Sequence, residues 1–475
     1  METADFVGRK KEFAILEELK THYKSAFVAL YGRRRIGKTF LVRTVFENKF
    51  DFQVTGIANA SIKTQLANFH AALLGYFPIL EGKAAPSNWF DAFLTLSKQL
   101  GPENATKKVL FLDELPWFDT PQSGFISALE HFWNSFASAR RDILLITCGS
   151  AASWMVNNLI NNHGGLHNRV THRIRLLPFT LAECEAYFNM RAMHFSRYQM
   201  VQMYMVMGGI PFYLEQVKKG LSIAQNIDRL CFSEDGFLNK EFHNLYPSLF
   251  RNAEKHLQII EALSKKAMGM TRAELMAATR LPDGGSITRV LRELEESSFI
   301  RKYQAFGKKQ QDAVYQLTDF YSLFYLRYIH AGQSAWSENF WVQNIDHPGI
   351  RAWSGYAFEL VCLMHLPAIK KALGIQGVSA QVAAWRGKNA QVDLVIDRRD
   401  QVINLCEMKF SIAPYTITQA YDGELRHKLQ AFREETATNK AIFITLLSTF
   451  GLVSNPYSSS SIENSLTLDD LFGEF

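Results

Sequence analysis

The sequence predicts an α/β fold of several domains, with a parallel sheet first, a winged helix in the middle and a second α/β domain at the end. Three observations lead to this prediction. An apolar strand, a glycine loop and a helix follow one another at residues 27–46, and two more apolar runs, at 109–112 and 143–146, end in polar residues. Three helical patterns then precede a hairpin pattern between residues 252 and 317. Strands alternating with helices are typical of parallel sheets, and helices followed by a hairpin are typical of a winged helix.

The length and composition set the limits of these predictions. At 475 residues, with 47% hydrophobic and 21% charged residues, the chain is expected to form about three globular domains. The net charge of +6 permits contact with nucleic acid without arguing for it. Five scattered cysteines without a C-x-x-C pair argue against a zinc site or a disulfide framework. Because neither a signal pattern nor an apolar run of about 20 residues is present, we expect a cytoplasmic protein without a membrane partner.

The glycine loop between the first strand and its helix has the spacing of a phosphate-binding site. Residues 32–39 read Gly-Arg-Arg-Arg-Ile-Gly-Lys-Thr, in which the glycines let backbone N–H groups point at phosphates. Lys38 would reach the β- and γ-phosphates, and Thr39 would bind Mg²⁺. We therefore expect ATP and Mg²⁺ as ligands, with contacts from Gly32, Arg33, Arg34, Arg35, Ile36, Gly37, Lys38, Thr39 and Phe40. The alternative is a glycine turn followed by a surface lysine.

Two carboxylates follow the apolar run that ends at residue 112. Ligands bind at the carboxyl ends of the strands in open α/β sheets, so Asp113 and Glu114 are placed to act on a bound nucleotide. Asp113 would hold Mg²⁺ and Glu114 would polarise the water that attacks the γ-phosphate. The pair predicts an ATPase, and a charged turn after a strand is the alternative.

Two further residues are candidates for the same site. Ser150 follows the third apolar run, where a polar side chain can contact the γ-phosphate or the attacking water, although it could equally cap a helix. Arg169 could neutralise transition-state charge as an arginine finger or be an ordinary surface residue.

Several of these segments together resemble a known family. Phe-Val-Gly-Arg at residues 6–9, the two nucleotide motifs, Cys-Gly-Ser at 148–150 and Gly-Gly-Ile-Pro at 208–211 resemble the archaeal ATPase group of the AAA+/STAND branch over about residues 1–240. The resemblance implies that Phe6 and Val7 lie beside the adenine and that Pro211 belongs to a helical lid near it. By pattern alone, these are a capped helix and a helix break.

The middle region predicts a winged helix-turn-helix. Its third helix, starting near Ser286, carries Arg289 and Arg292 for base contacts, and the following hairpin would contribute phosphate contacts from Lys302, Lys308 and Lys309. Three glutamates at positions 293, 295 and 296 share that helix, so a structural or protein-docking role stays equally open.

The last region carries a second set of charged residues. Glu359 lies in a helical pattern and Asp393 in a strand, while Glu407 and Lys409 alternate on the next strand and therefore share a face. Glu359, Asp393 and Glu407 could together bind Mg²⁺, with Lys409 orienting a water. This order resembles the PD-(D/E)xK nuclease fold and implies a metal-dependent DNA endonuclease, with Lys428 as a further candidate. A solvated strand end or a module that binds without cutting is the alternative.

These interpretations divide the chain into four domains. They are a P-loop NTPase core (1–178), a helical lid (179–248), a winged helix (249–330) and a restriction-endonuclease-like α/β domain (331–475). The first functional hypothesis is an ATP-hydrolysing enzyme that acts on DNA. The second is a STAND-type switch whose last domain binds partners without cutting nucleic acid. The sequence does not decide whether the chain forms a homo-oligomer.

Overall fold

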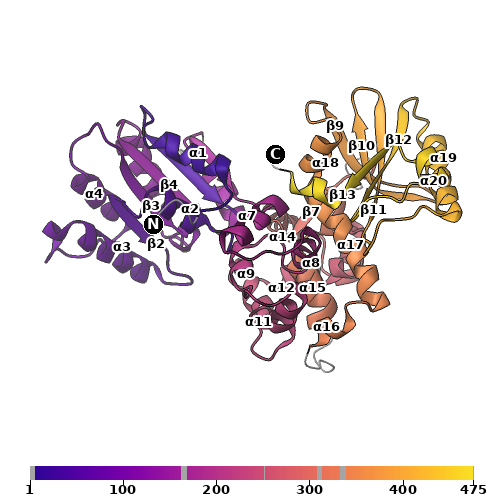
Figure 1. Cartoon of the computed structure of the whole chain (residues 1–475). Coiled ribbons are helices and arrows are strands. Elements are labelled where there is room, and N and C mark those ends of the chain that lie inside the picture. The colour runs from indigo at the N-terminus through magenta and orange to yellow at the C-terminus, as the bar shows by residue number, and fades with distance from the viewer. Residues whose placement is uncertain (1–5, 162–167, 251, 308–312, 332–338, 474–475) are drawn as a thin grey trace. The chain divides into compact units, whose positions relative to one another are not determined.

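The computed structural model describes residues 6–161, 168–250, 252–307, 313–331 and 339–473 (Figure 1). The chain forms two compact units. The first contains the residues up to Leu177 together with Glu296–Ser298, and the second contains Pro178–Glu295 and the residues from Phe299 onward.

A five-stranded parallel sheet forms the centre of the first unit. Its order is β2-β3-β4-β1-β5. The strands are β1 (Ala26–Tyr31), β2 (Phe52–Thr55), β3 (Lys108–Asp113), β4 (Ile143–Gly149) and β5 (His172–Arg175). Strands β1, β3 and β4 are buried over nearly their whole length, which requires cover on both faces of the sheet and explains their continuous apolar runs.

Helices and aromatic side chains complete this unit. The helices are α1 (Lys10–Leu19), α2 (Lys38–Val45), α3 (Ile62–Tyr76), α4 (Trp89–Gln99), α5 (Phe125–Phe132) and α6 (Ala152–Trp154). Trp89 lies at the centre of an aromatic cluster with Phe69, Phe118 and Phe125. Residues 52–55 alternate between buried and less buried positions and pair with β3 as strand β2.

The second unit begins with short helices. They are α7 (Leu181–Met190), α8 (Arg197–Met207), α9 (Pro211–Glu215), α10 (Ile223–Ile227) and α11 (Phe237–Leu245). Thr180 and Glu183 form a capping box at the start of α7. A Cβ atom on Gly209 would lie 1.9 Å from the carbonyl oxygen of Phe179, so the close approach of these two backbones requires glycine. Pro211 occupies the first turn of α9, where no backbone N–H is needed.

The middle of the chain contains three helices and a small antiparallel sheet of order β6-β8-β7. The elements are α12 (Glu254–Ser264), β6 (Met270–Thr271), α13 (Arg272–Thr279), α14 (Gly285–Glu296), β7 (Ile300–Tyr303) and β8 (Val314–Leu317). The hairpin of β7 and β8 packs on the C-terminal sheet, because the N–H of Phe306 donates to the carbonyl of Ala384 and its ring lies 5.1 Å from that of Phe432.

A second five-stranded sheet, of order β13-β12-β11-β10-β9, dominates the C-terminal part (Figure 1). The strands are β9 (Ala380–Arg386), β10 (Gln391–Arg398), β11 (Val402–Lys409), β12 (Ala441–Ser448) and β13 (Asn464–Thr467). Strands β9, β10 and β11 are antiparallel, whereas β11, β12 and β13 are parallel. The helices are α15 (Phe320–Phe324), α16 (Phe340–Asn344), α17 (Pro348–Met364), α18 (Leu366–Ala372), α19 (Gln419–Thr436) and α20 (Pro456–Ser461). None of the helices in the described residues has the length and hydropathy of a membrane-spanning segment.

Candidate nucleotide site and a second acidic site

The loop between β1 and α2 depends on its two glycines. Gly32 has φ +148°, and a Cβ atom there would lie 2.3 Å from the carbonyl oxygen of Leu176. Gly37, which precedes α2, has φ +86°, a conformation that L side chains rarely adopt. Ile36 between them is only 1% exposed and anchors the loop in the core. The backbone therefore turns tightly at the start of α2, as a phosphate-binding loop requires.

The Lys38 side chain is held inside this loop. Its ammonium donates to the carbonyl oxygens of Gly32 (3.1 Å) and Arg33 (2.9 Å) and to the hydroxyl of Ser150 (2.9 Å). Lys38 is only 6% exposed, which is rare for a lysine unless its charge is satisfied. A phosphate group in the loop would be an acceptor that the same ammonium can bind.

Strand order explains why Ser150 meets both nucleotide motifs. Strand β4 lies between β1 and β3, so the residue after β4 stands between the glycine loop and the carboxylates that follow β3. The Ser150 hydroxyl donates to Glu114 Oε1 (2.7 Å), and the Ser150 N–H donates to Glu114 Oε2 (3.3 Å). Lys38, Ser150 and Glu114 thus form one continuous hydrogen-bonded chain.

Thr39 and Asp113 form the second contact between the motifs. The Thr39 hydroxyl donates to Asp113 Oδ2 over 2.8 Å. Burial raises the pKa of Asp113, and the charge of Glu114 raises it further. A hydroxyl oxygen beside a buried carboxylate oxygen is a suitable pair of ligands for Mg²⁺, whose charge would offset this cost. The residues present therefore fit the expected metal.

Glu114 itself has an unusual backbone. Its φ is +48°, which is uncommon for a residue other than glycine, and its N–H donates to Asp113 Oδ1 over 2.9 Å. Such conformations often occur at functional sites, where the surrounding contacts hold them in place. Here the two hydrogen bonds from Ser150 supply those contacts.

The N-terminal turn lies beside α2. The Phe6 ring is 5.2 Å from the Phe13 ring and 6.2 Å from the Phe40 ring, and the Phe6 and Phe40 planes differ by 18°. Phe40 is 47% exposed, and Phe6 and Val7 are half-buried. This places a partly open aromatic surface next to the glycine loop, and adenine contact by Phe6 and Val7 stays a prediction.

The remaining nucleotide candidates differ in position. In the loop, Arg33 is buried, Arg34 is exposed and Arg35 is half-buried. Arg169 is exposed in the turn before β5, and its role as an arginine finger stays a prediction. Pro211 belongs to the second unit, so its adenine contact also stays a prediction.

In the second unit, Glu407 is the centre of a charged cluster on β11. The ammonium of Lys428 lies 2.7 Å from Glu407 Oε1, and the hydroxyl of Tyr421 donates to Oε2 over 3.1 Å. The Lys409 ammonium lies 4.5 Å from the centre of the Tyr421 ring. Glu407 and Lys409 therefore meet the same residue of α19, as expected for alternate positions of one strand face.

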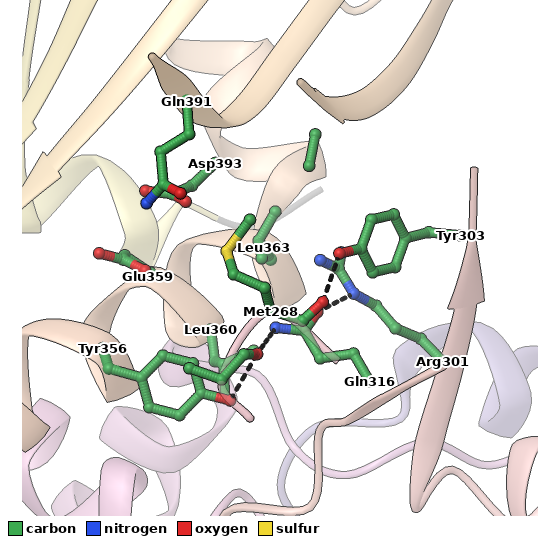
Figure 2. A pocket seen from close by; sticks show the side chains of 12 residues that line it. Met268, Arg301, Tyr303, Gln316, Tyr356, Glu359, Leu360, Leu363, Gln391 and Asp393 are labelled. Atoms are coloured by element: carbon green, nitrogen blue, oxygen red, sulfur yellow. Dashed lines mark hydrogen bonds between the residues drawn. The ribbon is translucent and has the colours of Figure 1, made fainter. Parts of the chain in front are cut away.

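Glu359 on α17 and Asp393 on β10 lie near this cluster and line one pocket (Figure 2). Burial raises the pKa of Glu359 to about 8, and the charges of Asp393 and Glu407 raise it as well. Burial and the charge of Glu407 likewise raise the pKa of Asp393. These carboxylates thus share a region where a bound cation would relieve their repulsion.

The same cluster is not arranged as a ready metal site. Among the described residues, no three His, Cys, Asp or Glu side chains stand together in a ligand arrangement. Both oxygens of Glu407 already accept hydrogen bonds, from Lys428 and Tyr421. The residue types fit Mg²⁺, but the cation would have to replace the Lys428 ammonium at Glu407.

The predicted DNA-contacting residues that the structure describes are separate from these two sites. Arg289 and Arg292 are exposed on α14, and the Arg289 guanidinium lies 3.7 Å from the Glu293 carboxylate. Lys302 is exposed on β7. Lys308 and Lys309 lie outside the described residues.

Two contacts at these sites were not predicted from the sequence. The Tyr421 hydroxyl donates to Glu407, and Arg301 lines the pocket of Glu359. Alternation along residues 300–303 places Arg301 and Tyr303 on one face, but no sequence signal shows what that face meets.

Comparison with known proteins agrees with the first site. Residues 6–217 match the model of a family described as an ATPase domain predominantly from Archaea. Over 417 residues, the chain is 23% identical to "Uncharacterized protein MJECL04" of Methanocaldococcus jannaschii, covering 85% of this chain and 87% of that protein. "Uncharacterized ATP-binding protein MJ0423" of the same organism is 48% identical over 44 residues, 9% of this chain and 75% of its own length.

Among solved structures, the Walker-type ATPase PABY2304 of Pyrococcus abyssi is 14% identical, with a TM-score of 0.48 over 68% of this chain and 97% of that chain. The ORC2 protein of Aeropyrum pernix is also 14% identical, with a TM-score of 0.43 over 70% of this chain and 96% of its own. The parallel sheet and the family match confirm the predicted α/β P-loop NTPase fold, and they support ATP as the ligand of the glycine loop. Residues 6–217 are therefore similar to the ATPase domains of a family found predominantly in Archaea.

Proposed function

We propose that the first unit hydrolyses ATP and that the second unit carries a Mg²⁺-dependent nuclease-like site for DNA. The hydrogen-bonded chain from Lys38 through Ser150 to Glu114 is the observation that carries the ATPase proposal. It links the residue that binds phosphate to the residue that activates water.

The residues would divide the work as follows. Lys38 would bind the β- and γ-phosphates. Thr39 and Asp113 would hold Mg²⁺, which would supply positive charge to neutralise the phosphate oxygens. Glu114 accepts a proton from the attacking water while Ser150 keeps its carboxylate in place. The water oxygen bonds to the γ-phosphorus and the bond to the β-phosphate oxygen breaks, which yields ADP and inorganic phosphate.

Two substitutions test the ATPase proposal. Lys38→Ala should abolish tight ATP binding in calorimetry, because the phosphates lose their cation. Glu114→Gln should keep binding and lose phosphate release, since an amide cannot accept the proton. Lys49→Ala removes an exposed lysine that pairs with Glu47, so this control should leave both measurements unchanged. Wild-type protein that binds neither ATP nor ADP would refute the proposal.

The nuclease proposal is supported by the element order α17-α18-β9-β10-β11-α19-β12 and by the charged residues that these elements bring close. Asp393 and Glu407 would hold Mg²⁺, and Lys409 would orient a water. Glu359 lies beside them, and the charges of Glu407, Lys409 and Lys428 all influence its carboxyl group. In this reaction water attacks a backbone phosphorus, and the departing sugar oxygen takes a proton.

A second candidate function is a nucleotide-controlled switch that does not cut nucleic acid. Two observations favour it. The Lys428 ammonium already neutralises Glu407. Phe306 of the hairpin of the proposed winged helix contacts Ala384 of the C-terminal sheet and Phe432 of α19. A hairpin used in this way has a structural role, and DNA contact would then fall to α14.

A cleavage assay separates the two functions. Plasmid and single-stranded DNA are incubated with the full chain in Mg²⁺ or Mn²⁺, alongside Glu407→Ala and Lys409→Ala. Glu424→Ala, on the exposed side of α19, serves as a matched control. Cleavage that both site variants lose and the control keeps supports the nuclease. Absence of cleavage under every condition, together with ATP turnover that DNA does not stimulate, supports the switch.

A further inference from the structure

A pocket of about 190 Å³ lies between the β7–β8 hairpin and the C-terminal elements α17 and β10. Figure 2 shows Arg301 and Tyr303 on one side of it and Glu359, Asp393 and Gln391 on the other. One water molecule needs only about 10–15 Å³ of such space, so the pocket can admit a larger group. The Arg301 guanidinium therefore faces the carboxylates of Glu359 and Asp393 across the pocket.

Arg301 lines the pocket, and two of its three guanidinium nitrogens make no hydrogen bond within the described residues. Its Nε donates to Gln316 Oε1 over 2.7 Å, and its guanidinium lies 4.6 Å from the centre of the Tyr303 ring. Within the described part of the chain, its Nη1 and Nη2 groups donate no hydrogen bond and form no ion pair. Burial lowers the pKa of Arg301, but a guanidinium stays charged at neutral pH. Arg301 is half-buried, and a cation partly removed from water without an anionic partner is costly, which suggests that an anion binds there.

Neighbouring contacts hold this arginine in place. The Gln316 amide donates to the carbonyl of Ala267 over 2.7 Å, and the Tyr303 hydroxyl donates to the carbonyl of Met268 over 2.6 Å. The hairpin itself is docked on the C-terminal sheet through Phe306. Arg301 is therefore presented to the pocket by a fixed strand, which lowers the entropy lost when it binds a ligand.

We propose that Arg301 binds a backbone phosphate of the nucleic acid that enters the second acidic site. The inference rests on the proposed nuclease function and adds a residue from the middle of the chain to it. A phosphodiester needs cations close by to approach Glu359 and Asp393, and the planar guanidinium fork matches two phosphate oxygens. The hairpin then supplies part of the cleavage site, which gives its packing against the C-terminal sheet a functional reason.

Oligonucleotide binding and cleavage test this role. Short single-stranded and duplex oligonucleotides are used as probes, with binding measured in Ca²⁺ and cleavage in Mg²⁺ or Mn²⁺. Arg301→Met should weaken binding and raise KM by about tenfold to a hundredfold, as expected for the loss of a hydrogen-bonded charge. Arg399→Met changes an exposed arginine just after the far end of β10 and should leave both values unchanged.

The outcomes separate this inference from the proposed function. If the wild type cleaves and Arg301→Met keeps the wild-type affinity and KM, the role of Arg301 is refuted while the nuclease stands. If the wild type does not cleave, the nuclease is refuted, and a binding loss specific to Arg301→Met would still support the phosphate site. Arg301→Lys keeps the charge without the fork and should lose part of the affinity. This variant decides the matter if Arg301→Met fails to fold.

Discussion

Removing the Ser150 hydroxyl should slow ATP hydrolysis and spare ATP binding. The hydroxyl lies between Lys38 and Glu114 and makes one hydrogen bond to each. With ATP bound, Lys38 has the phosphates as partners, whereas Glu114 still depends on Ser150 for its orientation. Ser150→Ala therefore acts mainly on the carboxylate that activates water.

The size of the effect follows from the contacts. A hydrogen bond to a charged group contributes about 1.5–3 kcal/mol. Ser150→Ala removes the 2.7 Å bond to Glu114 and leaves only the longer backbone contact of 3.3 Å. Because about 1.4 kcal/mol corresponds to a factor of ten in rate, kcat should fall roughly tenfold to a hundredfold.

Phosphate release measures kcat, and calorimetry measures the Kd for ATP. Ser25→Ala is the matched control, because its hydroxyl also donates one hydrogen bond, to Arg140, and accepts one, from Ile143. Ser25 lies before the start of β1 and the glycine loop lies after its end. The control residue is therefore about 20 Å from the glycine loop along the strand. A wild-type kcat in Ser150→Ala, or an equal loss in Ser25→Ala, would refute the proposed link between Ser150 and Glu114.

Three further predictions concern stability and ligand binding. Burial lowers the pKa of His365 to about 4, so the free energy of unfolding should fall by up to about 3 kcal/mol as the pH drops from 6.5 through 4. In chemical denaturation, His365→Gln should show a smaller change of this free energy with pH. Gly32→Ala should lose ATP binding in calorimetry because its Cβ atom meets the Leu176 carbonyl, whereas Gly75→Ala on the open side of α3 should keep binding and stabilise the chain by about 0.5–1 kcal/mol. Asp228→Ala should lower the free energy of unfolding by about 1.5–3 kcal/mol and speed hydrogen exchange in α16, because the Asp228 carboxylate accepts hydrogen bonds from two N–H groups at the start of that helix. Unchanged exchange would contradict this role.

Local patterns carried much of the nucleotide site. The glycine spacing from Gly32 to Lys38 predicts a loop whose positive φ values the structure shows, and the apolar run before Asp113 predicts a buried strand that is present as β3. Strand β2 was not predicted from the sequence, because four residues are too few to show a clear period and a long helix follows them. Its identity comes from pairing with β3, which is a tertiary fact.

The sequence by itself determined the chemistry of the residues and their local geometry: a glycine turn before Lys38, paired carboxylates after a strand, and a Glu407–Lys409 alternation. Only the tertiary structure decided which of these groups meet. Ser150 joins Lys38 and Glu114 because β4 is inserted between β1 and β3, and Arg301 faces Glu359 because a hairpin docks on a distant sheet. The physical reason is that dihedral preferences and hydrophobic period act over a few residues, whereas strand order and docking depend on burying apolar surface between segments that are far apart in the chain.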